Sequence, residues 1–183
     1  YNVDASNIRN QSDVGGGGLL DIGCYCISSS RWICNREPER VIGLFDKDPS
    51  FGTDRLASGI LDFGNCLQAS FTCSTQVAPY QRINILGTHG RVEIDIPFNA
   101  PPDRPCRVSL YPGTHSDQGR FEPAESQVLD MDICDQYTLQ GEAISLAILN
   151  DEPVPYELED AVGNMRTLEA LRQSNESSAW IVP

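Results

Sequence analysis

The stretch VGGGGLLDIGCYCISSSRW, Val14 to Trp32, runs four consecutive glycines directly into an apolar segment. Glycine adopts backbone conformations that other residues avoid, so such a run predicts a tight turn or a close backbone approach. The residues that follow, Leu19–Cys34, predict a helix, and Pro38 lies just beyond it, as is usual after a helix end. This part of the chain is therefore expected to be a glycine turn that opens a helix.

A dinucleotide-binding phosphate loop is the first alternative for these glycines. That loop has the pattern G-x-G-x-x-G between a strand and a helix. The spacing fails here, because the positions that would complete it hold Leu20 and Asp21. The preceding residues, SNIRNQSD, do not form a strand pattern, and no G-K-[ST] follows the run. The glycines are therefore not predicted to hold a phosphate.

Beyond Pro38 the hydrophobic period changes from helical to alternating, which is typical of strands. Strands are predicted at Val41–Phe45, Ser58–Phe63, Cys66–Ser74, Arg82–Leu86, Arg91–Ile96, Arg107–Tyr111 and Gln127–Ile133. Two helices close the chain, Tyr137–Asn150 and about Leu158–Ser174. Because turns rather than helices join the strands, we expect an α+β fold with a largely antiparallel open sheet and helices on one face. Residues 1–183 are expected to form a single domain.

Composition excludes several functions. The formal net charge of −13 disfavours nucleic acid and anionic membranes as partners. No run approaches the ~18 apolar residues that a membrane span needs, and no signal peptide is visible, so a cytoplasmic location is expected. The chain begins without Met, which suggests a processed or truncated product. Its seven cysteines contain no C-x-x-C pair and are expected to be reduced thiols, with no metal site.

Asp21 and Tyr25 stand four residues apart, so their side chains are neighbours on a helix. A carboxylate and a phenol side by side can take part in proton transfer. A phenol acts as a base near neutral pH only when a nearby cation favours its charged form, and Asp21 cannot supply that charge. Asp21 is therefore expected to orient a substrate. The structural alternative places Asp21 at a helix N-terminus and Tyr25 in the core.

The stretch GGGGLLDIGCY resembles the G-G-G-x-L-x-D-x-G-x-[HY] signature that opens the C-terminal domain of the Gfo/Idh/MocA oxidoreductases. Four further segments resemble that domain, so the resemblance spans nearly the whole chain: NIRN (Asn7–Asn10), EPERV (Glu37–Val41), LGTHGRVEIDIPF (Leu86–Phe98) and EDAVGNMRTLEALRQS (Glu159–Ser174). It implies an α+β domain with a substrate pocket and an open sheet used for oligomerisation. The family's N-terminal Rossmann domain, which binds NAD or NADP, is not part of this chain.

The resemblance also implies roles for particular residues. Tyr25 would be the proton donor or acceptor that accompanies hydride transfer, and Asp21 would position the substrate. Arg9, in the NIR segment, and Tyr137, at the start of a helix, are expected to bind substrate. The family's activating lysine stands in an E-K-P motif of the Rossmann domain, and Lys47, in FDKDP, does not match it. The cation that Tyr25 needs is thus expected from outside this chain.

The expected function is that of a substrate-binding and oligomerisation domain of an NAD(P)-dependent oxidoreductase. The whole enzyme would act on a hydroxyl or carbonyl of a sugar-like or polyol substrate, as a homodimer or tetramer assembled through the open sheet face. NAD or NADP would be held mainly by the absent domain, and the isolated chain would be inactive. The alternative is a non-catalytic assembly or ligand-binding module on the same scaffold.

Overall fold

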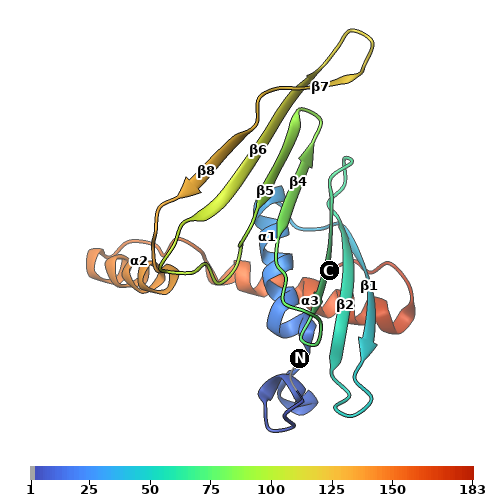
Figure 1. The fold of residues 1–183 in the computed structure, drawn as a ribbon. Coiled ribbons are helices and arrows are strands. Elements are labelled where there is room, and N and C mark those ends of the chain that lie inside the picture. Colours follow the sequence, from blue (N-terminus) through green and yellow to red (C-terminus); the bar gives the residue numbers. More distant parts are fainter. Residues whose placement is uncertain (1–2) are drawn as a thin grey trace. The chain divides into compact units, whose positions relative to one another are not determined.

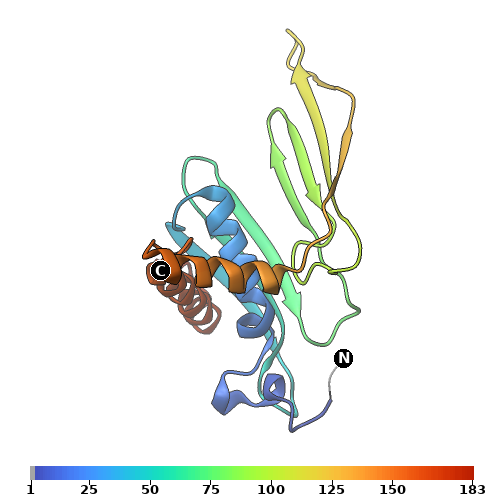
Figure 2. The same cartoon turned by 90° about the vertical axis from the view of Figure 1, so that its left-hand side faces the viewer.

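A computed structural model describes residues 3–183 and divides into two compact units (Figures 1 and 2). The first unit holds the described residues up to Ala78 together with Tyr156–Pro183, and the second is Pro79–Pro155. Every strand pairing is antiparallel, and both units carry a helix, so the predicted α+β class is confirmed. The strands divide over two sheets. That residues 1–183 act as one domain stays a prediction.

The first unit carries the glycine turn, two α-helices and a three-stranded sheet of order β1-β2-β3. Its elements are the 3-10 turns η1 (Ile8–Asn10) and η2 (Ser12–Val14), the π-helical turn η3 (Leu19–Gly23), α1 (Cys24–Cys34), β1 (Arg40–Lys47), β2 (Asp54–Asp62), β3 (Gln68–Ser74) and α3 (Leu158–Ser177). The helix predicted from Leu19 is present, but its first turn is π-helical, a form that often occurs at functional sites.

The core of the first unit lies on one face of this sheet. Alternate strand residues on that face, such as Val41, Ala57 and Leu61, are fully buried against Ile27 of α1 and Leu171 of α3. The predicted arrangement with helices on one face therefore holds for this unit. The opposite face leaves its large apolar side chains exposed, at Leu44, Leu56 and Ile60.

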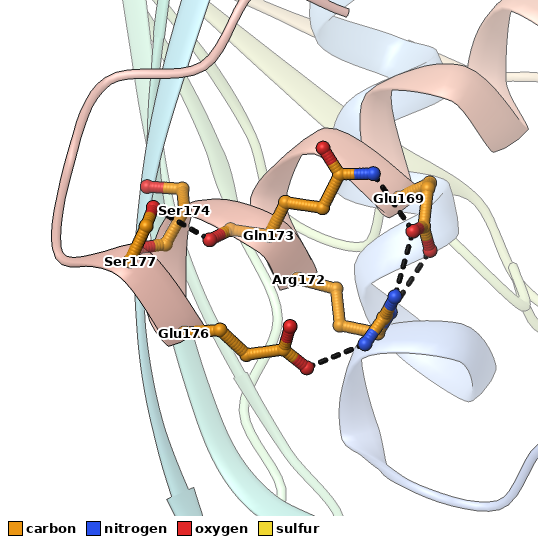
Figure 3. Close-up of polar contacts among 6 residues, drawn as sticks. All are labelled: Glu169, Arg172, Gln173, Ser174, Glu176 and Ser177. Atoms are coloured by element: carbon orange, nitrogen blue, oxygen red, sulfur yellow. Dashed lines mark hydrogen bonds and ion pairs between the residues drawn. The ribbon is translucent and has the colours of Figure 1, made fainter.

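The second half of α3 covers β1, which is an edge strand. Ser174 Oγ accepts a hydrogen bond from the backbone of Gly43 at 3.0 Å, and Asn175 Oδ1 accepts one from Phe45 at 2.8 Å. Figure 3 shows Arg172 on another side of α3, between Glu169 and Glu176. Side chains of α3 thus satisfy backbone donors that an edge strand would otherwise leave open.

The first half of α3 is not part of this core. An apolar stripe of Leu158, Val162, Met165, Leu168 and Leu171 follows the helical period, yet only the last two are buried. Val162 and Met165 instead line an open groove of about 600 Å³ beside the C-terminal Val182 and Pro183. The stripe is therefore covered only where α3 packs on β1.

The second unit is built around β6 (Cys106–His115), the longest strand, which pairs with three others. The remaining elements are β4 (Ile83–Gly87), β5 (Gly90–Ile94), β7 (Phe121–Pro123), β8 (Gln127–Met131) and α2 (Gln136–Asn150). The predicted hairpin at residues 87–90 joins β4 to β5, whereas β7 was not predicted. Figure 1 shows the β6–β7 hairpin running beyond the β4–β5 turn.

The β4-β5-β6-β8 sheet has one apolar and one polar face. Ile83, Ile94, Val108 and Leu129 lie side by side across it, and Ile85, Val92 and Leu110 form the next row of the same face. The other face carries ion pairs, Arg82 with Asp95 and Arg107 with Asp130. Within this unit only Ser109, Gly113 and Ala147 are buried. The two apolar rows are half-buried, except for Leu129, which is exposed.

Residues 3–183 include no helix with the length and apolarity of a membrane span. The cytoplasmic location stays a prediction.

Candidate functional site

The glycine run folds back onto the first 3-10 turn of the chain. Gly16 donates a backbone hydrogen bond to the carbonyl of Gln11 at 2.8 Å, and Gly17 donates one to the carbonyl of Arg9 at 2.9 Å. Gly15 and Gly17 have φ of +83° and +122°, a region that favours glycine. A Cβ at Gly16 would lie 2.6 Å from two backbone carbonyl oxygens. The run therefore makes the close backbone approach that its composition predicts, and it holds the backbone of Arg9.

A half-buried carboxylate, Asp54 at the start of β2, closes this turn from the other side. Its Oδ2 accepts a hydrogen bond from the backbone of Leu19 at 2.6 Å, at the first turn of the helix. A Cβ at Gly17 would lie 2.1 Å from its Oδ1. Burial raises the pKa of Asp54, although backbone hydrogen bonds from Leu19 and Gly18 act in the opposite direction.

The carboxylate of Asp54 thus accepts an amide at the N-terminus of the helix, where anions commonly bind. That the glycines hold no phosphate stays a prediction. Sequence reasoning missed Asp54, which lies 35 positions after Leu19. No motif spacing connects the two residues, so only the tertiary fold reveals the contact.

Arg9 and Asp21 form an ion pair across the glycine turn. Arg9 Nε lies 2.7 Å from Asp21 Oδ2, with the two side chains 45% and 30% exposed. The hydrogen bond to Asp21 is the main cause that raises the pKa of Arg9, followed by the Coulombic attraction of the same carboxylate. Both residues were predicted site residues, but their pairing was not predicted, because they lie on separate elements.

Tyr25 lies at the surface of α1 with 49% of the residue exposed. The structural alternative in which it packs in the core is therefore wrong. Attraction to Tyr25 is the smallest of the influences that raise the pKa of Arg9, which indicates that the two side chains lie near each other. The direct contact of Arg9 is with Asp21.

This arrangement places a cation of the chain itself near Tyr25. Asp21 offsets the charge of Arg9, however, so the pair presents to the phenol a dipole rather than a full positive charge. The expectation that an activating cation comes from outside these residues stays a prediction. The three side chains can still donate and accept hydrogen bonds toward a substrate hydroxyl.

Tyr137, the fourth predicted site residue, belongs to the second unit. It lies in the first turn of α2, where Asp135 accepts a hydrogen bond from its backbone at 3.0 Å. Its hydroxyl donates to Asn99 Oδ1 at 2.8 Å, and the residue is 65% exposed. Its role in substrate binding stays a prediction.

Metal and thiol chemistry find little support in the described part of the chain. Residues 3–183 contain no group of three or more His, Cys, Asp or Glu side chains placed to hold a metal ion. Burial raises the pKa of Cys26 to about 11 and that of Cys73 to about 12. These two thiols therefore stay protonated at neutral pH and pack as small apolar groups.

Comparison with known proteins places this geometry in a family. A model of the GFO/IDH/MocA C-terminal domain matches residues 1–93. An uncharacterized oxidoreductase of Rhizobium meliloti is 38% identical over 179 residues, which cover 98% of this chain and 52% of that protein. The D-xylose 1-dehydrogenase (NADP(+)) 2 of Haloferax volcanii is 28% identical over 182 residues, 97% of this chain and 51% of that protein.

Among solved structures, the aldose-aldose oxidoreductase from Caulobacter crescentus complexed with glycerol superimposes with a TM-score of 0.77 at 23% identity. The match covers 98% of this chain and 52% of that one, and it shows a shared fold. This chain thus spans about half the length of the two curated relatives. The chain belongs to the GFO/IDH/MocA family of oxidoreductases, as a C-terminal domain of that family.

Proposed function

We propose that this chain is the substrate-binding and oligomerisation domain of an NAD(P)-dependent oxidoreductase that acts on a sugar-like or polyol substrate. The observation that carries the proposal is the exposed Tyr25 beside the Arg9–Asp21 ion pair. A polyhydroxy substrate offers donors and acceptors to all three side chains. The relatives support the chemical class, since one is named as an NADP-dependent xylose dehydrogenase and a structural neighbour is complexed with glycerol.

In the proposed reaction Tyr25 handles the proton. When bound, the nicotinamide supplies the hydride acceptor or donor. In the reducing direction the Tyr25 hydroxyl donates its proton to the oxygen of the substrate carbonyl, which becomes a hydroxyl. In the oxidising direction the phenolate oxygen of Tyr25 accepts the proton of the substrate hydroxyl. This requires a nearby cation that favours the phenolate. Arg9 and Asp21 hold neighbouring hydroxyls of the substrate and fix its orientation.

The described residues do not fit the dinucleotide phosphates at the glycine run, because the Asp54 carboxylate already accepts the amide of the first helical turn. We therefore infer that NAD or NADP binds mainly to residues outside this chain. The isolated chain should not turn over substrate. Calorimetric titration of it with NADH should show no binding at micromolar concentrations, and micromolar affinity would contradict this inference.

The test of Tyr25 uses the whole protein that carries this chain, assayed against a panel of aldoses and polyols with NAD and NADP. Tyr25→Phe removes the transferable proton but keeps the ring, so kcat should fall by about 10²–10⁴-fold. Tyr156→Phe is the matched control, since Tyr156 is an exposed tyrosine elsewhere in the first unit. Full activity of Tyr25→Phe would overturn the assigned role.

We further propose that the apolar face of the second sheet forms an interface between copies of the protein, giving a homodimer or tetramer. The rows containing Val108 and Leu110 on that face are only half-buried, and α2 does not pack on them. A contiguous apolar sheet face of this kind is typical of an interaction surface. The polar face, with its ion pairs, is suited to water instead.

A further inference from the structure

We propose that Asp54 is a positioning residue of this site, which holds Arg9 where it can pair with Asp21 beside Tyr25. The inference rests on the proposed function for the meaning of the site, but the contacts themselves belong to the described fold. The hydrogen bond of Asp54 is to the backbone of Leu19, and not to the side chain of Arg9, Asp21 or Tyr25. It acts on them through the glycine turn.

The path from Asp54 to Arg9 has two short steps. The Asp54 carboxylate accepts the Leu19 amide at 2.6 Å, and its other oxygen packs against Gly17, where a Cβ would lie 2.1 Å away. Gly17 in turn donates its amide to the carbonyl of Arg9 at 2.9 Å. The carboxylate therefore fixes the glycine whose backbone fixes Arg9.

A second path ties the same carboxylate to Asp21. Leu19, whose amide Asp54 accepts, is the first residue of the π-helical turn that carries Asp21. The amide of Asp21 donates to the carbonyl of Gly17 at 3.2 Å. Both partners of the Arg9–Asp21 ion pair are thus hydrogen-bonded to the segment that Asp54 holds. Displacing that segment would therefore disturb the 2.7 Å contact between them.

Burying a carboxylate at this place costs free energy, which the hydrogen bonds that it accepts must offset. Burial disfavours its charge, and the amides of Leu19 and Gly18 compensate only in part, since the net effect raises the pKa of Asp54. A neutral side chain could fill the space without that cost. The retained acceptor oxygens are explained by the helix-start amides that they hold, because charge-assisted hydrogen bonds are about twice as strong as neutral ones.

Asp62 offers a matched control. It lies at the other end of β2, and its carboxylate also accepts a backbone amide from a glycine loop, that of Gly64 at 3.0 Å. It further pairs with Arg40 at 2.8 Å. The control thus shares strand, residue type and bonding pattern with Asp54, but it has no path to Arg9.

The first measurement is hydrogen exchange of the backbone amides. Asp54→Ala and the isosteric Asp54→Asn should speed exchange of the amides of residues 16–21 by about tenfold or more, because the clamp that closes the turn is lost. Residues 27–34 of α1 should exchange as before. Asp62→Asn should leave the glycine turn unchanged. Unchanged exchange at residues 16–21 in both Asp54 variants would overturn the proposal, whatever the protein catalyses.

The second measurement is a double-mutant cycle on kcat/KM in the whole protein. We expect Asp54→Ala to lower kcat/KM by about 10–100-fold, the cost of misplacing a binding group by roughly 1 Å. If Asp54 acts through the Arg9–Asp21 pair, the double variant Asp54→Ala, Arg9→Met should lose clearly less than the product of the two single losses. Losses that multiply would show a general structural role and overturn the proposal.

The two arms separate this inference from the proposed function. Should Tyr25→Phe and Arg9→Met both leave turnover unchanged, the assigned chemistry fails, while the exchange data still decide whether Asp54 holds the Arg9 segment. Should those variants lose activity while Asp54→Asn and Asp54→Ala keep it, the function stands and the positioning role of Asp54 is wrong.

Discussion

The two units of this chain bury their side chains very differently. The first encloses a core in which Phe63, Ile27 and Leu61 have no exposed surface. The second, with more strands, buries only Ser109, Gly113 and Ala147 among its residues. The proposed site residues all lie in the first unit, apart from Tyr137. The 2.7 Å Arg9–Asp21 ion pair thus belongs to the unit that has an enclosed core.

This difference follows from how each sheet is covered. Helices α1 and α3 bury one face of the β1-β2-β3 sheet, and side chains of α3 satisfy the edge of β1. In the second unit, both β7 and β8 pair with β6, and the apolar row through Val108 has no helix of that unit packed on it. A sheet whose apolar face stays open is stabilised when another surface covers it.

The largest expected effect compares a buried side chain of the first unit with a half-buried one of the second. Phe63→Ala should lower the free energy of unfolding by about 3–5 kcal/mol, because it empties a fully buried site. Leu110→Ala in the half-buried row of the second sheet should cost only about 1 kcal/mol. Urea denaturation of the two variants measures both values. Equal costs would show that the two units do not differ in packing.

A smaller effect is expected at the glycine turn. Gly17→Ala should lower the free energy of unfolding by about 1–3 kcal/mol, since φ is +122° and the new Cβ would meet the Asp54 carboxylate. Gly52→Ala is the control, because Gly52 also has a positive φ of +72° but open space around it. Thermal denaturation should rank Gly17→Ala as clearly the worse, and a reversed order would contradict the packing described for the turn.

The open face of the second sheet is tested by adjacent residues of one strand. Leu129 lies on the apolar face and Val128 on the polar face of β8, and both are about half exposed. Leu129→Lys should weaken self-association about tenfold or more, since it buries a charge in the proposed interface. Val128→Lys should leave association unchanged. Sedimentation equilibrium measures the constants, and the proposal fails if the two variants behave alike.

The smallest expected effect is a pH dependence from Asp54. Its pKa is raised in the folded protein by burial, so the folded state binds its proton more tightly than the unfolded chain does. The resulting stabilisation is fully present below the unfolded pKa of about 3.8 and is lost as pH rises through the raised folded pKa. The stability of the unmodified protein minus that of Asp54→Asn should therefore increase as pH falls toward 3.8. A flat difference in thermal midpoints would contradict the burial of this carboxylate.

Local patterns were enough to predict most elements. The alternation in residues 66–74 predicts one face of Leu67, Ala69, Phe71 and Cys73. The last three pack on the core, whereas Leu67 precedes β3 and is exposed. The change from alternating to helical period located α2 and α3 within a few residues. Short β7 escaped prediction because three residues, Phe121–Pro123, carry no periodic signal. The local pattern also did not predict which part of α3 is buried, since Leu158 belongs to the apolar stripe of that helix and is nevertheless exposed.

By itself, the sequence determined the glycine turn, the helix after it and the α+β class, because these depend on spacing and composition. It also proposed Asp21, Tyr25 and Arg9 as site residues from the family motif, and their roles stay predictions. Only the tertiary structure decided that Arg9 pairs with Asp21, that Tyr25 is at the surface, and that Asp54 closes the turn. Such contacts join elements far apart in the chain, and their geometry depends on how those elements pack rather than on any local pattern.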